Sequence, residues 1–515
     1  MTGETVRLRA PQLTDEVFVS FAQALAANAR RLGEAPAAID ETGTLSWMAL
    51  ADLAARIAGR LAQQGIGPGH CVMSLSENSA AHLALYAGVL WAGACMVPLP
   101  FSASDEALAK MAADCAAPLL FTSATQAPRA AALGVGTVAL DDIAAWATGP
   151  AIAPVPVGPD DLFDIIYSSG TTGTPKGIQH DHRFRSRQFG RFTVFGLDEA
   201  AVQVMTTPLY SNTTLVAVLS GLVGGGRIVS MRKFDTLGFL QLAQTHRATH
   251  AMLVPVQYMR LMKEERFGDF DLSSFRCKFS TSAPLPGVLI RQVMTRWPGN
   301  LVEFYGMTEG GVTTVLDCAA HPDKWDTAGL VPEGNEVKII DDDGGELPPG
   351  AFGEIVGRSG SMTPGYLNLP DKTNELVWRD AEGRDFIRTG DMGRLDEDGF
   401  LHLMDRRKDM IITGGFNVYA ADLEQVLRHH PAVADVAVIA IPSEDWGETP
   451  LALVVPQGDP DPEEIRTWAN ARLGKLQRIS QVEFRDSLPR SEIGKILKRE
   501  LRVPYWDAVK TAEEV

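Results

Sequence analysis

Helix-like and strand-like stretches alternate along the chain from residue 17 to about residue 300. Residues 18–32 and 47–64 carry apolar side chains at helical spacing, whereas 71–75 and 94–99 are short apolar runs typical of buried strands. Further strand candidates, each with a helical stretch nearby, are 202–209, 226–231 and 249–256. Because parallel strands are usually joined through helices, this alternation predicts a layered α/β fold with largely parallel sheets.

The rest of the 515-residue chain has a different pattern. Residues 335–404 contain strand-like runs separated by Gly/Pro turns, which predicts a β-rich subdomain. After Lys408, short strands and helices are mixed, as in a compact α+β domain of about a hundred residues. A chain of this length is expected to hold at least two domains. The Pro/Ala-rich stretch 151–161 is a plausible linker.

One uncharged stretch, residues 83–101, is nearly long enough to span a bilayer. Gly93 and the prolines at 98 and 100 interrupt it. These residues favour a helix over about 79–92 followed by a short buried strand, because proline ends regular structure. We therefore expect no membrane span.

Charge and cysteine content exclude several classes of protein. The net charge of −17 argues against a nucleic-acid surface, which would require a basic stripe. The five cysteines are scattered without a close pair, so neither a disulfide framework nor a zinc site is indicated. The N-terminus lacks the apolar core of a signal peptide, and we expect a cytoplasmic protein.

The loop YSSGTTGTPKG, residues 167–177, is the strongest candidate for a ligand site. Glycines at 170, 173 and 177 let backbone N–H groups approach a ligand, and Lys176 adds a positive charge. The hydroxyl and glycine residues that precede this lysine are Ser168, Ser169, Gly170, Thr171, Thr172, Gly173 and Thr174. The strand predicted just upstream would place the loop at a strand's carboxyl end, where ligands of α/β proteins bind. The spacing matches neither a Walker A loop nor GxGxxG, so the residues alone predict phosphate binding and leave a flexible polar loop as the alternative.

This loop resembles the signature loop of the adenylate-forming superfamily, which includes acyl- and aryl-CoA synthetases, adenylation domains and luciferase. Four further stretches resemble motifs of the same family, in the family's order: YGMTEGG (305–311), RTGD (388–391), DRRKDMIITGGFNVYAADLE (405–424) and PRSEIGKILKREL (489–501). The resemblance implies a large N-terminal domain over residues 1–407 and a small mobile C-terminal domain over residues 408–515. It also implies that Mg-ATP and a carboxylic acid form an acyl-AMP, with the loop clamping the departing pyrophosphate.

The resemblance assigns three catalytic residues. Lys495 would bridge the carboxylate and the α-phosphate, a task suited to a point charge on a long stem. Thr308 would hydrogen-bond the α-phosphate, and Glu309 would hold Mg²⁺, which prefers oxygen ligands. Without the resemblance, Glu309 would be read as a surface carboxylate, and Lys495 as a solvated lysine in a basic tail. Better candidates for such a solvated tail are Lys498, Arg499 and Arg502.

Other residues are assigned to the nucleotide in the same way. Tyr305 would flank the adenine, with Gly306 beside it, and Asp391 would accept both ribose hydroxyls. Arg406 would support the ribose from the other side. The segment that lines the adenine and the acid would consist of Ser282, Ala283 and Pro284.

Family members perform their second half-reaction after the C-terminal domain swings about a hinge, and Lys408 matches the hinge position. The swing would remove Lys495 and bring in Gly414 and Gly415, which would line the path of the CoA thiol because a pantetheine arm must pass close to backbone. A simple glycine turn between two strands is the alternative for this pair, and the two interpretations are compatible.

Several positions depart from the family pattern. Ser211 and Asn212 stand where many relatives have a histidine, and Thr281 and Ser282 replace two glycines of the acid pocket. Bulkier hydroxylated side chains would narrow that pocket and disfavour a long straight acyl chain. Two further departures, after the hinge, are Ala420 and Asp422.

Two other motifs have simpler interpretations. GLVGGGRIV (221–229) has the wrong spacing for a dinucleotide loop and predicts a helix-to-strand turn. HDH (180–182) could suggest a metal site, but we interpret it as a helix start, with His182 at a position where relatives commonly have histidine.

We therefore expect an ATP-dependent ligase that uses Mg²⁺ and coenzyme A to convert an aromatic or bulky acid to its thioester. No carrier-protein or condensation segment is recognised, which favours a standalone enzyme. One alternative is an adenylating enzyme that passes the acyl group to an amine or a carrier-protein thiol. A second is a nucleotide-binding protein that has lost catalysis. No nucleic-acid partner is expected, and a homodimer is left open.

Overall fold

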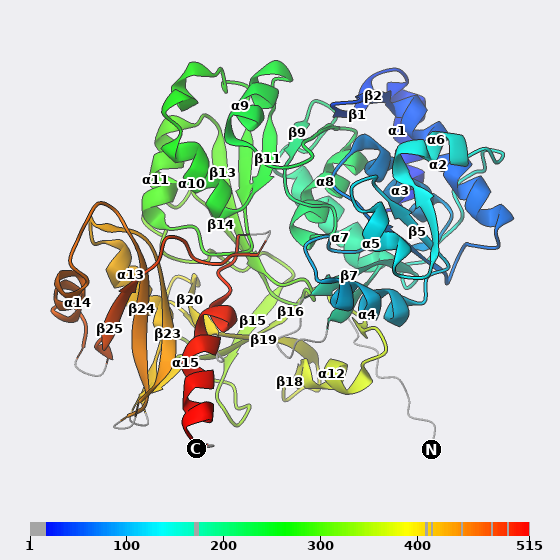
Figure 1. The fold of residues 1–515 in the computed structure, drawn as a ribbon. Helices are drawn as coiled ribbons and strands as arrows, with labels where there is room; N and C mark the ends of the chain where they lie inside the picture. Colours follow the sequence, from blue (N-terminus) through cyan, green and yellow to red (C-terminus); the bar gives the residue numbers. More distant parts are fainter. Residues whose placement is uncertain are drawn as a thin grey trace, which may run out of the picture. The chain divides into compact units, whose positions relative to one another are not determined.

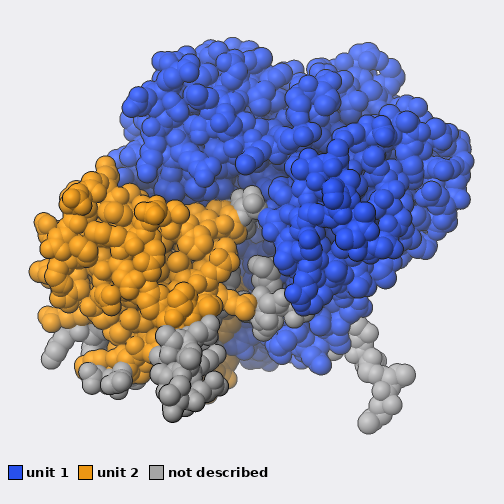
Figure 2. Space-filling view, viewed as in Figure 1, with its two compact units in different colours: residues 1–337, 356–388 blue, residues 338–355, 389–515 orange. Residues whose placement is uncertain are grey.

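The computed structural model describes residues 17–168, 175–406, 410–413, 416–443, 446–474, 477–491 and 494–513. The chain divides into two compact units (Figure 2). Unit 1 comprises residues 1–337 and 356–388, and unit 2 comprises residues 338–355 and 389–515. The predicted domain boundary between residues 407 and 408 lies outside the described residues and stays a prediction.

An eight-stranded sheet forms one layer of unit 1 (Figure 1). Its strands, in spatial order, are β14 (Thr313–Asp317), β13 (Asn300–Gly306), β12 (Cys277–Ser280), β11 (His250–Leu253), β9 (Val202–Met205), β10 (Arg227–Ser230), β1 (Pro36–Asp40) and β2 (Gly43–Ser46). The six strands from β13 to β1 are parallel, and the two edge strands are antiparallel to their neighbours. Most of these strands are joined through helices, as the alternating pattern predicts. These helices are α8 (Asn212–Gly224), α9 (Thr236–Thr245), α10 (Pro255–Lys263) and α11 (Gly287–Arg296).

A seven-stranded sheet forms a second layer of unit 1. Its strands, in spatial order, are β17 (Gly365–Tyr366), β8 (Lys176–Asp181), β7 (Leu162–Ser168), β4 (Cys95–Pro98), β3 (Cys71–Leu75), β5 (Leu119–Thr122) and β6 (Gly136–Ala139). Strand β8 is antiparallel to both of its neighbours, and the other pairs are parallel. The mostly parallel order again agrees with the predicted layered α/β fold.

The remaining helices of unit 1 include one, α3, that explains most of the long uncharged stretch. These helices are α1 (Phe21–Leu32), α2 (Trp47–Gln63), α3 (Ala80–Trp91), α4 (Asp105–Cys115), α5 (Ala127–Ala131), α6 (Ile143–Trp146), α7 (His182–Thr193) and α12 (Pro370–Glu375), with short 3₁₀ turns at Leu140–Asp142 and Glu265–Asp269. Almost every residue of α3 is buried, and β4 follows it at once. The prediction of a core helix and strand at 79–98 is confirmed. In the described part of the chain, no helix is long and apolar enough to cross a membrane.

The stretch 151–161 does not connect two domains. It forms no helix or strand and lies inside unit 1, where the Ile152 amide donates to the Ala55 carbonyl and the Val155 amide to the Trp91 carbonyl. The Trp91 indole also donates to the Ile152 carbonyl at 2.8 Å. The linker prediction is wrong because hydrogen bonds of Ile152 and Val155 hold this stretch against α2 and α3 as a strap within unit 1.

The β-rich subdomain is present as a five-stranded sheet. It contains β15 (Glu336–Ile340), β16 (Gly353–Arg358), β19 (Asp385–Leu395) and β18 (Val377–Arg379) in spatial order, with β20 (Leu401–Arg406) paired to β19. The division between the units falls within β15, β16 and β19.

The C-terminal part of unit 2 is a compact α+β fold with its own core. Its sheet contains β22 (Phe416–Val418), β21 (Ile411–Thr413), β24 (Gly447–Pro456) and β23 (Val433–Ser443), with β25 (Gln481–Phe484) paired to β24. The helices are α13 (Ala420–Arg428), α14 (Pro462–Asn470) and α15 (Lys498–Glu513). Buried residues of β23, β24 and α13 form one apolar cluster. The predicted combination of a large α/β part, a β-rich subdomain and a small α+β part is confirmed.

Candidate active site

Strands β7 and β8, which precede and follow the glycine-rich loop in the sequence, pair as an antiparallel hairpin. Strand β7 ends at Ser168, β8 begins at Lys176, and these two residues are cross-strand partners. The predicted position at a strand's carboxyl end is confirmed. The loop residues Ser169, Gly170, Thr171, Thr172, Gly173 and Thr174 lie outside the described residues, so their phosphate-binding role stays a prediction.

The segment with Thr308 and Glu309 follows β13, which ends with Tyr305 and Gly306. The Thr308 carbonyl lies 2.8 Å from His180 Nε2, which donates to it. The next carbonyl, that of Glu309, accepts the Thr363 amide at 2.8 Å. Hydrogen bonds from two other parts of unit 1 therefore hold the backbone of this segment.

Tyr366 joins the glutamate to the lysine of the hairpin. Its hydroxyl donates to Glu309 Oε1 at 2.8 Å, and Lys176 Nζ lies 4.9 Å from the centre of its ring. Burial, together with the Glu309 carboxylate, raises the pKa of Tyr366 well above its usual value, so the phenol stays a donor. The structure thus brings the predicted Lys176 and Glu309 to the same tyrosine.

Tyr366 is a site residue that the sequence analysis missed. It lies in β17, a two-residue strand that pairs with β8, between Pro364 and Pro370. Two residues are too few for any periodicity, so the only available signal was one aromatic residue in a Gly/Pro-bounded turn.

The segment predicted to line the acid pocket follows β12, the strand beside β13. Ser280 and Glu303 are register partners in this parallel pair, so the loops after the two strands leave the same edge of the sheet. Ser282 Oγ lies 2.6 Å from Thr213 Oγ1 on α8, and the backbone φ of Ser282 is 80°, a left-handed value that favours glycine. Ala283 and Pro284 complete the loop before α11, and their contact with adenine stays a prediction.

Glu303 supports this loop from β13. Its Oε1 accepts the Leu285 amide at 2.8 Å, and its side chain is buried. Burial raises the pKa of Glu303 to about 8, although the Leu285 hydrogen bond acts in the opposite direction. Glu303 is therefore protonated at neutral pH, which lets a carboxyl group lie in an apolar interior without a cation partner.

Unit 2 holds the predicted ribose residues on paired strands. Asp391 on β19 and Arg406 on β20 are cross-strand partners. The Asp391 amide donates to Thr389 Oγ1 at 3.0 Å, which holds the backbone of the TGD motif within β19. Adjacent positions suit two residues that would hold one ribose, and the role itself stays a prediction.

Two hydrogen bonds join Lys495 to Ser491, four residues earlier in the chain. The Ser491 amide donates to the Lys495 carbonyl at 2.8 Å, and the Lys495 amide donates to Ser491 Oγ at 3.2 Å. Arg490 donates to the Gly494 carbonyl at 2.7 Å and to Asp435 Oδ2 at 2.6 Å, which ties this turn to β23. The catalytic role of Lys495 stays a prediction.

Lys498 is not a solvated tail residue, in contrast to the expectation. Its Nζ lies 2.8 Å from Glu424 Oε1, and the exposed fractions of these two side chains are 13% and 7%. Lys498 stands in the first turn of α15, which packs on β23, and this position lets the lysine bind the buried carboxylate.

The hinge residue Lys408 and the pair Gly414 and Gly415 lie outside the described residues.

Glu309 is suited to hold Mg²⁺. One carboxylate oxygen is bound to Tyr366, which leaves Oε2 as a hard oxygen ligand for a cation that usually takes one or two carboxylates plus phosphate oxygens. In the described part of the chain, no group of three His, Cys, Asp or Glu side chains could hold a metal ion.

The HDH motif begins a helix, as expected. Helix α7 starts at His182, and Asp181 Oδ1 accepts the Phe184 amide at 2.8 Å.

The GLVGGGRIV motif is also explained by local structure. Helix α8 ends in this motif, Gly225 caps it with a φ of 89°, and β10 begins at Arg227. The predicted helix-to-strand turn is confirmed.

Comparison with known proteins agrees with this arrangement. The chain is 34% identical over 483 residues to a feruloyl-CoA synthase from Amycolatopsis sp, with 92% of this chain and 96% of the relative covered. It is 32% identical to a 4-coumarate-CoA ligase from Narcissus pseudonarcissus, with 92% of each chain covered. It is also 32% identical to a fatty acid–[acyl-carrier-protein] ligase from Streptomyces coeruleorubidus, with 97% and 98% covered.

A solved structure shows the same fold. The crystal structure of ATP-bound MatB from Rhodopseudomonas palustris superposes with a TM-score of 0.85 at 30% identity, over 95% of this chain and 99% of that one. Acyl-CoA ligases of this family use ATP, Mg²⁺ and CoA, and the prediction of an AMP-forming acyl-CoA synthetase is confirmed.

Family models match both parts of the chain. The model described as AMP-binding enzyme matches residues 25–367, and the model described as AMP-binding enzyme C-terminal domain matches residues 422–495. The predicted resemblance is confirmed, and the chain belongs to the AMP-binding enzyme family.

Proposed function

We propose that this chain activates an aromatic carboxylic acid with Mg-ATP to an acyl-AMP and transfers the acyl group to coenzyme A. A carboxylate is a poor electrophile, and the mixed anhydride with AMP supplies a good leaving group. The main barrier is the approach of one anion to another, which requires positioning and positive charge. The relatives named as feruloyl-CoA synthase and 4-coumarate-CoA ligase support this choice of acid and acceptor.

The observation that carries the proposal is the contact of Tyr366 with both Lys176 and Glu309. The lysine would neutralise charge on the departing pyrophosphate, and the glutamate would hold Mg²⁺, which neutralises phosphate charge when bound. Thr308, next to Glu309, would donate to the α-phosphate. A cation, a hydroxyl and a metal ligand in one region of unit 1 are the groups that this reaction requires.

The shape of the acid site favours a bulky, flat acid. The Ser282 side chain, which lies 2.6 Å from Thr213 Oγ1, fills space that a glycine at position 282 would leave open. One turn along α8 from Thr213, Ala217 packs in a cluster with Met252 and Phe279. A site narrowed in this way suits a compact aromatic acid better than a long alkyl chain.

The remaining steps belong to unit 2. Lys495 would act in adenylation, and Gly414 and Gly415 would line the thiol path after a swing about Lys408. Asp391 and Arg406 of unit 2 would hold the ribose, whereas the adenine would be held by residues of unit 1, Tyr305 and the loop from Ser282 to Pro284.

We also propose that the enzyme works in the cytoplasm as a homodimer or a monomer. All five cysteines are free, including Cys71 and Cys95, which are register partners on adjacent strands, and free thiols are typical of a reducing compartment. Light scattering of the purified protein distinguishes the two assembly states.

Pyrophosphate release over a panel of cinnamic, benzoic, branched and straight-chain acids tests the proposal, followed by product analysis with CoA. We expect the highest kcat/KM with hydroxylated cinnamic acids and a CoA thioester in amounts equal to AMP. If pyrophosphate is released but no thioester forms with any acid, an amine or carrier-protein thiol is the acceptor. If no acid releases pyrophosphate, the chain is a nucleotide-binding protein without this activity.

A further inference from the structure

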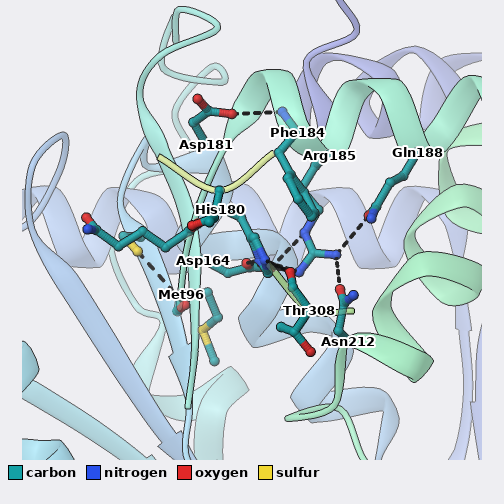
Figure 3. Close-up of polar contacts among 12 residues, drawn as sticks. Met96, Asp164, His180, Asp181, Phe184, Arg185, Gln188, Asn212 and Thr308 are labelled. Carbon is teal, nitrogen blue, oxygen red and sulfur yellow. Dashed lines mark hydrogen bonds and ion pairs between the residues drawn. The ribbon is translucent and has the colours of Figure 1, made fainter. Parts of the chain in front are cut away.

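A polar cluster lies in the core of unit 1, beside the segment that carries Thr308 (Figure 3). Asp164 on β7 and His180 on β8 flank the glycine-rich loop in sequence, and His180 Nδ1 lies 2.6 Å from Asp164 Oδ1. Arg185 on α7 donates to the same carboxylate at 2.7 and 2.9 Å. The Tyr86 hydroxyl on α3 donates to Asp164 Oδ2 at 2.6 Å. All four side chains are buried.

Arg185 and His180 balance the negative charge of the buried Asp164 carboxylate. Burial alone would raise its pKa, but the charges of Arg185 and His180 hold the pKa of Asp164 well below its usual value. Such a cluster is a costly way to fill a core, because apolar side chains of similar volume are often as stable or more so. Its directed hydrogen bonds can instead fix the positions of the segments that they join.

The cluster reaches two parts of the proposed active site. His180 Nε2 donates to the Thr308 carbonyl at 2.8 Å, since a carbonyl only accepts. Arg185 Nη1 donates to Asn212 Oδ1 at 2.7 Å, at the first residue of α8. Helix α8 also carries Thr213, the partner of Ser282. One buried cluster therefore joins the hairpin of the phosphate loop, the Thr308–Glu309 segment and the helix of the acid site.

Two neighbours fix the position of the His180 ring, Phe184 by stacking and Asp164 by a hydrogen bond. It stacks on Phe184, with ring centres 4.1 Å apart and planes 18° apart. Asp164 sets the direction of the ring through Nδ1, which aims Nε2 at the Thr308 carbonyl. The ring thus transmits the position of the β7–β8 hairpin to the backbone of Thr308.

We propose that His180 is a positioning residue for adenylation. Its hydrogen bond to the Thr308 carbonyl sets the direction of the Thr308 hydroxyl and the Glu309 carboxylate relative to the hairpin that carries Lys176. This inference rests on the proposed function, in which Thr308 and Glu309 act in the first half-reaction. A displacement of about 1 Å in such a site can lower a rate by about 100-fold.

Two substitutions separate the two hydrogen bonds of the ring. His180→Gln can place its amide nitrogen near the position of Nε2 and keep the donor to Thr308. His180→Asn can place its amide near the position of Nδ1, keep the contact with Asp164 and lose the bond to Thr308. Both replace the ring by an amide, so they are matched in polarity and in the loss of stacking on Phe184.

The readouts are acid-dependent ATP–pyrophosphate exchange, which reports adenylation, and consumption of chemically prepared acyl-AMP with CoA. For His180→Asn we expect kcat of exchange to fall about 10- to 100-fold with KM for the acid within about threefold, and the second reaction to keep its rate. His180→Gln should recover most of the exchange. Both reactions are measured on one sample, so a loss of folded protein lowers them equally.

Equal losses in both reactions, or equal losses of exchange in both variants, would overturn the proposal and assign the cluster to stability alone. An unchanged exchange rate in His180→Asn would also overturn it. Failure of the proposed CoA ligase function would appear differently, as exchange in the wild type without a thioester product. A wild type without exchange for any acid would overturn both.

Discussion

The Tyr366 hydroxyl donates a 2.8 Å hydrogen bond to Glu309 Oε1, while the ring of the same tyrosine lies 4.9 Å from Lys176 Nζ. This single side chain connects the hairpin of the phosphate loop to the proposed metal ligand. It fixes one carboxylate oxygen and leaves the other for Mg²⁺. The two charged groups of the site therefore depend on one buried phenol.

Tyr366→Phe tests this connection. A hydrogen bond to a charged group contributes about 1.5–3 kcal/mol, so we expect the apparent KM for Mg-ATP to rise about tenfold or more. The Tm should change little, because the ring stays in place. Tyr505→Phe is the matched control, since it removes a hydroxyl that donates to Glu483 Oε2 at 2.6 Å outside the proposed site. If both variants keep the wild-type KM, Tyr366 does not hold the metal ligand.

Ser282→Gly tests the narrowed acid site. Glycine removes the side chain that lies against Thr213 and adopts the φ of 80° without strain. We expect kcat/KM for ring-substituted cinnamic acids to rise relative to unsubstituted cinnamic acid by about tenfold, the scale of one or two added carbon atoms in an apolar site. The Tm should stay within a few degrees.

Thr213→Val separates volume from hydrogen bonding at this site. Valine keeps the shape of threonine but cannot bond to Ser282. We expect the preference among acids to stay as in the wild type. A shift in Thr213→Val as large as that in Ser282→Gly would show that the hydroxyl bond, and not the occupied volume, sets the preference.

Glu303→Gln tests the protonated carboxyl group. The pKa is about 8 in the folded protein and about 4.5 in the unfolded chain, so the folded state binds more protons between these values. The stability that this proton provides is complete below about pH 4.5 and is lost as pH rises to about 8. Glutamine keeps an acceptor for the Leu285 amide and does not titrate.

The measurement is the free energy of unfolding of both proteins from pH 5 to pH 8.5. We expect the wild type to lose stability relative to Glu303→Gln as pH rises, by up to about 1.4 kcal/mol per pH unit. A constant difference between the two proteins over this range would mean that Glu303 titrates normally.

Lys495→Ala and Lys498→Ala form a pair that separates catalysis from stability. Lys495→Ala should lower acyl-AMP formation by about 100-fold or more, while preformed acyl-AMP still reacts with CoA. Lys498→Ala should instead lower the free energy of unfolding of unit 2 by about 1–3 kcal/mol, because buried Glu424 loses a cation at 2.8 Å and keeps Arg428 at 3.0 Å. Equal losses of both half-reactions in Lys495→Ala would contradict a role confined to adenylation.

Much of the fold could be predicted because its elements have strong local signals. Helix α3 is apolar except at His82, strand β4 is apolar, and Gly93 between them has a φ of 69°, so this helix and strand could be predicted correctly. The packing of the strap at 151–161 could not be predicted, because its prolines and alanines predict only an irregular segment. Whether such a segment is exposed or packed depends on partners such as Ala55 and Trp91, which are far away in the sequence.

The same limit applies to the site. Thr308, Glu309 and Lys176 stand in recognisable motifs, but Tyr366 and His180 act through contacts with residues 57 and 128 positions away. Asp164 looked like any residue of a buried strand, and only the tertiary structure shows its pairing with Arg185 and His180. Lys498 was misread for a related reason, since nothing local indicates that Glu424 is buried beside it.

The most direct test of the account is the fate of a hydroxylated cinnamic acid incubated with ATP, Mg²⁺ and CoA, followed by mass spectrometry. We expect a CoA thioester and AMP in equal amounts. Leaving out CoA should abolish the thioester, and leaving out ATP should abolish AMP. AMP formed at the expense of ATP without any CoA thioester would contradict it.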